Sequence, residues 1–216
     1  MSSLTGVADG RGARLPRSAR RKQLLAAAQE VFVANGYHAA AMDDIAERAG
    51  VSKPVLYQHF PGKLDLYLAL LDAQAEALAA SVVAALDGTD DNHERIHRVL
   101  TAYFDFVDRD DHDGAFRLIF ESDIVNDPEV RKRVESVTAR TMRAVADTVA
   151  ADTGLRRPEA ELLATALTGS AQVVARWWLA SERPVTQDEA IALLESLLWR
   201  GISNFPRTGA PATPGA

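Results

Sequence analysis

No cysteine occurs among the 216 residues of this chain. This absence excludes disulfide bonds, thiolate-bound metals and cysteine nucleophiles, and it agrees with a reducing compartment. Long uncharged apolar runs are also missing, so the sequence predicts no membrane-spanning segment. The N-terminal residues lack the apolar core of a signal peptide. We therefore expect a cytoplasmic protein, and its length allows one or two domains with a sizeable core.

Enzyme motifs are scarce as well. The sequence has no glycine-rich loop that would hold a phosphate, and none of its serines stands in a nucleophile elbow. One string, His93-Glu94-Arg95-Ile96-His97, matches the H-E-x-x-H pattern of zinc peptidases, which sets two imidazoles on one helix face beside a glutamate. It stands in the first turn of an expected helix, and the third ligand would have to be His112 or a carboxylate. We expect no enzyme, no cofactor and no metal, and keep a zinc metallopeptidase as the alternative.

Basic residues are concentrated near the N-terminus. The first 63 residues hold nine Lys or Arg and five Asp or Glu, whereas the rest holds fifteen and twenty-five, within a net charge of −6. This distribution favours a molecule that offers one basic face to phosphates and keeps an acidic body away from them. Residues 1–16 are predicted to be a disordered basic arm. The arm either is a solvated tail or reaches phosphates and the minor groove beside a DNA-reading helix.

Two short helices joined by a tight turn are predicted within residues 36–63. The first ends before Gly50, at a position where a left-handed conformation costs little without a Cβ. The hydroxyl of Ser52 is predicted to cap the second helix, residues 53–60, by accepting a bond from a first-turn N–H. These features predict a helix-turn-helix whose second helix enters the major groove of DNA.

The string AMDDIAERAGVSKPVLYQHFPGKLDLY resembles the DNA-binding signature of the TetR family of bacterial transcriptional regulators, with a close match over about residues 17–71. Its diagnostic part is the Leu-Tyr-x-His-Phe-x-x-Lys run that ends at Lys63. The resemblance implies an all-α fold, with a helix-turn-helix domain at residues 17–62 and a helical ligand-binding and dimerisation domain at residues 63–205. The expected DNA contacts lie on the arm and around the second helix: Arg17, Arg20, Lys22, Ser52, Lys53, Pro54, Tyr57, Gln58, His59 and Lys63.

Three positions depart from the family pattern, and at one of them Val55 replaces a common Thr. Ala40 and Ala41 stand where relatives usually carry Thr and Ser or Thr, which cap the helix and bond a phosphate. Asp43 and Asp44 partly compensate through the helix dipole. Asp43 either accepts from a cytosine amine or only stabilises the helix end, and we favour the helix end. Phosphate anchoring is then expected to rest on the arm and on three side chains, Tyr57, His59 and Lys63.

Helical periodicity continues through the second domain. The strongest boundary is Asp127-Pro128, an N-cap followed by proline at the first helical position. A Thr-x-x-Glu capping box begins the last helix at Thr186. Residues 206–216 are predicted to be a disordered tail. The expected helices cover about residues 18–35, 63–86, 93–109, 115–125, 127–152, 158–181 and 186–204.

The last two predicted helices are apolar around most of their circumference, more than a single buried stripe requires. This pattern favours burial on two sides, against the core and against a second subunit, with a large monomer core as the alternative. The resemblance implies the same arrangement, a dimeric four-helix bundle. The candidate interface residues are Val173, Trp177, Leu194, Leu198 and Trp199.

The resemblance also implies a small-molecule effector bound within the second domain. Candidate pocket residues are aromatic or polar, with plain core as the alternative: Tyr103, Phe104, Phe116, Phe120, Met142, Gln172, Arg176 and Trp177. The expected function is repression of transcription by a homodimer on a palindromic double-stranded DNA operator, released by the effector. An activator and a regulator without an effector remain open.

Overall fold

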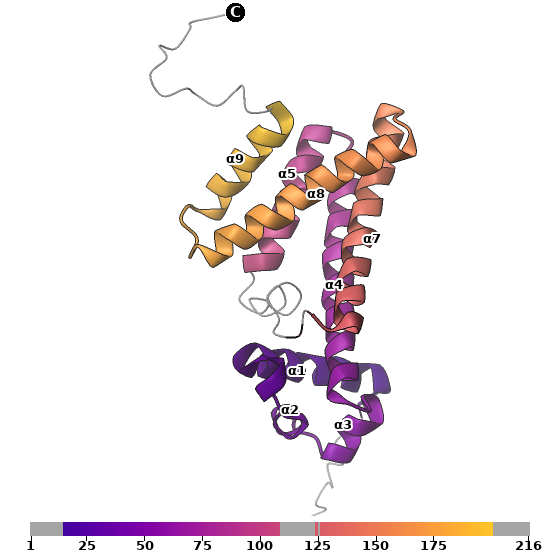
Figure 1. Ribbon diagram of the computed structural model, residues 1–216, viewed down its shortest axis with the longest axis vertical. Coiled ribbons are helices and arrows are strands. Elements are labelled where there is room, and N and C mark those ends of the chain that lie inside the picture. Colours follow the sequence, from indigo (N-terminus) through magenta and orange to yellow (C-terminus); the bar gives the residue numbers. More distant parts are fainter. Residues whose placement is uncertain (1–14, 109–123, 125, 201–216) are drawn as a thin grey trace, which may run out of the picture.

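The computed structural model describes residues 15–108, 124 and 126–200, and every regular element in these ranges is an α-helix (Figure 1). Three helices form a small N-terminal domain, and longer helices form a second body above it in the figure. The predicted tail and nearly all of the predicted arm and of the helix at 115–125 lie outside the described residues. The all-α, two-part organisation predicted from the sequence is confirmed.

The N-terminal domain consists of α1 (Arg17–Ala39), α2 (Met42–Arg48) and α3 (Lys53–His59). The backbone of α1 is interrupted at Gly36, where φ is 74°, and one more turn follows where the sequence predicted the helix to end. A glycine suits this position because other residues rarely adopt a positive φ. The turn places the Tyr37 ring 5.1 Å from that of Tyr67, which closes the domain against the next helix.

Helix α4 (Lys63–Asp87) begins in the DNA-binding domain and ends at the far end of the second body. It packs against α1, α5 and α7. In the part of the chain that the structure describes, it is the one helix long and apolar enough to span a membrane by length and composition, which the sequence analysis did not expect. Its charged side pairs with α7, since Asp72 lies 3.1 Å from Arg133 and Glu76 lies 2.6 Å from Arg140. These contacts are those of a helix in a bundle.

The second body continues with α5 (Asn92–Asp108), α7 (Pro128–Thr153), α8 (Arg157–Ala180) and α9 (Gln187–Arg200). Helix α7 lies between α4 and α8, and α5 packs against α4, α8 and α9. The predicted N-cap is present, because Asp127 accepts from the backbone N–H of Glu129 at 2.9 Å. The predicted capping box is present as well, since the Thr186 N–H donates to Glu189 at 2.9 Å.

Candidate DNA-binding surface, effector cavity and subunit face

The turn between α2 and α3 is held by backbone geometry. Gly50 adopts a φ of 63°, its N–H donates to the Glu47 carbonyl at 2.9 Å, and the Val51 N–H donates to the Ala46 carbonyl at 3.0 Å. Any residue with a Cβ would be strained at this φ. One side chain from each helix, Ile45 and Leu56, is completely buried. The turn and this shared core fix the orientation of α3 on the domain.

Ser52 is the N-cap residue of α3, but its side chain makes no capping hydrogen bond, contrary to the prediction. The reason lies in the next residues. An N-cap hydroxyl accepts from the second or third helical N–H, and Pro54 removes the second donor. The third donor, the N–H of Val55, bonds instead to the Ser52 carbonyl at 3.0 Å. The exposed Ser52 hydroxyl is therefore not engaged in capping the helix.

The outer face of α3 is polar and accessible. Lys53, Pro54, Tyr57 and Gln58 are exposed, and 46% of the Tyr57 side chain is accessible although it is a large aromatic residue. The Lys53 ammonium lies 2.6 Å from the Asp43 carboxylate. Its hydrogen bond to Asp43 raises the pKa of Lys53 above its ordinary value. These four of the expected DNA contacts thus share one open helix surface.

A basic hollow adjoins the end of α3. It has a volume of about 350 Å³ and brings the start of α1 next to His59. Burial lowers the pKa of His59, and the positive charges of Arg17, Arg21 and Arg20 lower it further. Lys22 is exposed on α1 close by in sequence. Cations of α1 therefore gather beside the exposed face of α3, as an anion-binding surface requires.

Lys63 makes contacts within the domain that the sequence did not predict. Its ammonium donates to the backbone carbonyls of Tyr37, His38 and Ala40 at 2.9, 3.1 and 2.9 Å. It also lies 4.7 Å from the centroid of the Tyr37 ring. Because an ammonium has three N–H donors, these bonds use all of them. In this structure Lys63 ties the first residue of α4 to the end of α1, and a phosphate contact would require it to give up a carbonyl.

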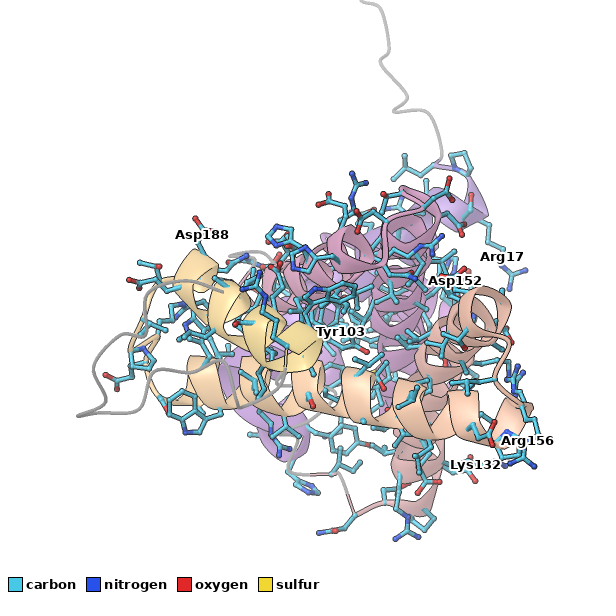
Figure 2. All side chains as sticks on the ribbon, turned by 90° about the horizontal axis from the view of Figure 1, so that it is seen from above. Arg17, Tyr103, Lys132, Asp152, Arg156 and Asp188 are labelled. Carbon is cyan, nitrogen blue, oxygen red and sulfur yellow. The ribbon has the colours of Figure 1, made fainter. Side chains whose placement is uncertain are left out.

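The second body contains a mainly apolar cavity of about 210 Å³ at the end remote from α3. Arg95 stands among its lining residues with only 14% of its side chain exposed, and it pairs with Asp152 at 2.5 Å. Figure 2 views the molecule from this end and labels Asp152. Five helices contribute the lining: Leu86, Asn92, Arg95, Ile96, Val99, Leu100, Val145, Thr148, Val149, Asp152, Thr153, Leu163, Leu167, Thr168 and Leu198.

None of the described residues predicted for the pocket lines this cavity. Tyr103 and Phe104 are buried, with the Phe104 ring 5.3 Å from that of Trp178. Burial raises the pKa of Tyr103 to about 12. The remaining candidates are placed elsewhere: Met142 and Gln172 are half-buried, Arg176 and Trp177 are exposed, and Phe116 and Phe120 lie outside the described residues. The cavity is lined instead by aliphatic side chains of α5 and α7, which helical periodicity alone does not distinguish from core residues.

Large apolar side chains are exposed along α8 and α9. Three predicted interface residues are among them, since Val173, Trp177 and Trp199 are 55%, 59% and 48% exposed, and we call this exposed apolar surface the candidate subunit face. Leu194 is not among them, because it is only 4% exposed and packs in the core of its own chain. Leu198 is half-buried and lines the cavity. The outward positions of α9 are instead the neighbours of these two leucines, Leu193 and Leu197.

In this structure the H-E-x-x-H string is engaged in contacts between α5 and α9. Both imidazoles bond the same carboxylate of α9, with His93 Nε2 and His97 Nδ1 each 2.9 Å from Glu195. Glu94 pairs with Arg98 at 2.8 Å. No group of three or more His, Cys, Asp or Glu side chains within residues 15–108 and 126–200 is arranged to hold a metal ion. The string serves to join α5 to α9.

Comparison with known proteins gives matches along nearly the whole chain. A family model described as bacterial regulatory proteins of the tetR family matches residues 24–70, and a tetracyclin repressor-like C-terminal domain matches residues 92–201. The transcriptional activator FasR of Mycolicibacterium smegmatis is 46% identical over 198 residues, which are 92% of this chain and 90% of that protein.

Two solved structures are similar in fold. A TetR-like transcriptional regulator from Rhodococcus sp. RHA1 is 30% identical with a TM-score of 0.67, over 89% of this chain and 100% of that one. FadR from Bacillus subtilis, solved in complex with stearoyl-CoA, is 19% identical with a TM-score of 0.66, over 84% of this chain and 98% of that one. At that identity the second likeness concerns the fold alone.

Proposed function

Since this chain belongs to the TetR family of bacterial transcriptional regulators, we propose that it binds a palindromic operator as a homodimer under the control of a small apolar effector. It is a DNA-binding regulator of transcription and not an enzyme, so the zinc peptidase alternative is rejected. A DNA partner supports an action in the cytoplasm. A separate observation supports each part of this proposal, which are operator binding, dimer formation, effector binding and the direction of control.

One observation carries the operator proposal, the open polar face of α3. Lys53, Tyr57 and Gln58 project from a helix whose opposite side is fixed by the fully buried Leu56. A short helix presented in this way fits the major groove, where side chains of these types reach base edges. The cations near the start of α1 supply attraction to the phosphates that flank the groove.

The experiment that tests operator binding is selection of bound sequences from random DNA by the full chain. We expect an enriched palindrome whose half-sites are about one helical turn, roughly 34 Å, apart. The absence of any enriched sequence at low salt would contradict operator binding.

The subunit face supports the homodimer. Val173 and Trp177 on α8 and Leu193 and Leu197 on α9 leave a contiguous pair of helices with large apolar side chains in solvent. Exposed apolar surface of this kind marks an association site. A two-fold axis pairs the same face of each subunit, and it would place the two α3 helices in the opposite orientations that a palindrome requires.

The apolar cavity supports the effector. Its lining is mainly aliphatic, and Arg95 with Asp152 provides polarity at one place, which suits an apolar molecule with one charged group. An anionic group would compete with Asp152 for Arg95. The cavity touches Leu86 near the end of α4, and α4 continues into the DNA-binding domain. Filling the cavity would therefore shift α4 and change the spacing of the two α3 helices.

Activation is the direction of control that we favour. FasR, at 46% identity, is named a transcriptional activator. Repression, which the sequence analysis expected, is the second candidate, because a dimer bound across a promoter blocks the polymerase by occupancy alone. Transcription in vitro from a promoter carrying the selected operator distinguishes the two. We expect more transcript with the protein than without it, and less transcript would favour repression.

A further inference from the structure

The ion pair between Asp43 and Lys53 joins the first turns of the two helices of the helix-turn-helix. Asp43 Oδ2 lies 2.6 Å from Lys53 Nζ, and the two side chains are 57% and 61% exposed. An ion pair this open contributes little to folding stability. A carboxylate beside DNA also repels phosphates, so its presence on this surface needs an explanation in terms of what it binds.

The pair stands on the side of α3 that is open to DNA. Tyr57 follows Lys53 by one helical turn, so the two share a face. The pKa of Lys53 is raised, first by the hydrogen bond to Asp43, so the ammonium remains charged at neutral pH. This face thus presents a fixed donor, Lys53, beside a fixed acceptor, Asp43.

A donor beside an acceptor matches a G·C base pair in the major groove. Guanine offers two acceptors, N7 and O6, to an ammonium, and the paired cytosine offers its N4 amine to a carboxylate. Adenine offers the ammonium only N7, with a donor amine next to it, and thymine offers only O4. Only G·C gives Lys53 two acceptors while giving Asp43 an amine on the other base.

We propose that Asp43 and Lys53 read one G·C base pair in each half-site as a unit. Lys53 donates to guanine, and Asp43 accepts from the amine of the paired cytosine. The proposal rests on the operator binding proposed above. Asp43 is then a specificity-determining residue outside α3, because only a G·C pair gives its carboxylate an amine while giving Lys53 two acceptors on the paired base. Its role extends beyond the stabilisation of the end of α2 that the sequence favoured.

The test is selection from random DNA by four full-length proteins: wild type, Asp43→Ala, Asp43→Asn and Asp44→Ala. Wild type is expected to select one nearly invariant G·C pair per half-site. Asp43→Ala should lower the preference for that pair about tenfold, the effect of one base contact, without weakening binding to random DNA. Asp43→Asn should shift the preference toward adenine, which the asparagine amide recognises. Asp44→Ala removes a carboxylate from the same turn, keeps the ion pair, and should leave the preference unchanged.

Two results would overturn the proposal. One is an Asp43→Ala protein that keeps the full G·C preference and binds all sequences more weakly, as expected if Asp43 only stabilises α2. The other is an equal change of preference in Asp44→Ala. A wild-type protein that enriches no sequence would reject the operator binding itself, which is a distinct outcome. Thermal melting of each variant, followed by circular dichroism, distinguishes a loss of folding from a change in base preference. Asp43→Asn also keeps the shape of the native side chain.

Discussion

The two parts of this molecule position their functional residues over different distances along the chain. In the helix-turn-helix, the turn at Gly50, the buried Leu56 and the exposed Lys53 stand within seven residues of one another. In the second body, the cavity is lined by residues from Leu86 to Leu198, on five helices. The comparison shows that the DNA-reading surface is set by local sequence, whereas the cavity and the subunit face depend on how long helices pack.

Helix α4 is where the two parts meet. The buried Gln74 on α4 donates from its side-chain amide to Gln29 of α1 at 2.6 Å. Lys63, at the start of the same helix, holds the end of α1 through three carbonyls. A movement of α4 would therefore be transmitted to α1 through specific polar contacts. This division can be tested with substitutions in the helix-turn-helix domain and in the second body. Stability, dimer formation, ligand binding and operator affinity are then measured for each variant.

The largest effect is expected at the subunit face. Leu193→Glu or Leu197→Glu would place two symmetry-related charges in the apolar contact, at a cost of several kcal/mol. The protein should sediment as a folded monomer, and operator affinity should fall by about 10²–10⁴ because the second half-site is no longer bound intramolecularly. The control variant is Leu194→Ala, at a leucine that is buried in its own chain. It should lose about 2–5 kcal/mol of folding stability and still form dimers. A charged variant that remains dimeric would contradict this face.

The next effect distinguishes two lysines of the DNA-binding domain. Lys63→Ala leaves three carbonyls without their donor and should cost about 1.5–3 kcal/mol of domain stability. Thermal melting followed by circular dichroism measures this loss. Lys22→Ala is the matched control, because Lys22 is exposed and its loss should reduce the salt dependence of DNA binding by about one counterion without changing the melting temperature. If Lys63→Ala melts like wild type and only flattens the salt slope, Lys63 is a phosphate contact after all.

A smaller effect is expected from filling the cavity. Val149→Phe should weaken binding of the anionic apolar dye 1-anilinonaphthalene-8-sulfonate at least about fivefold, equivalent to roughly 1 kcal/mol, and should change operator affinity in the direction that a bound effector does, because a filled cavity shifts α4. Dye fluorescence measures the first property and DNA titration the second. The control is Val83→Phe, which enlarges an exposed valine of α4 outside the cavity lining. Equal dye binding by wild type and Val149→Phe would contradict the proposal that this cavity binds the ligand.

The smallest effect concerns pH. The folded-state pKa of His59 lies below the ordinary value of 6.5, because of burial and nearby arginines. The stability it contributes is present above pH 6.5 and is lost as the pH falls through the lowered pKa. A bound phosphate would favour the protonated ring and so raise the pKa of His59. A rise by about half a unit corresponds to an increase in operator affinity of about threefold between pH 7.5 and 6. His59→Gln should abolish that increase, and an unchanged increase would show that another group causes it.

The sequence predicted the helix-turn-helix better than the second body. It placed the turn at Gly50 and the exposed side of α3 correctly because glycine conformation and helical periodicity act over a few residues. It did not predict the carbonyl bonds of Lys63, whose partners are more than twenty residues away. It also chose Leu194 over Leu193 for the subunit face. Adjacent residues on a helix differ by about 100°, and only the packing of α9 against α5 decides which of them points outward.

The most direct test of the central claim is operator spacing. If the second body fixes the distance between two α3 helices, it must also fix the distance between the half-sites they read. Titration of wild-type protein on the selected palindrome, and on the same palindrome with about half a helical turn, roughly five base pairs, inserted at its centre, measures this requirement. The account predicts that the insertion lowers affinity by about 10²–10⁴, to that of a single half-site. Equal affinity for the two DNAs would contradict it.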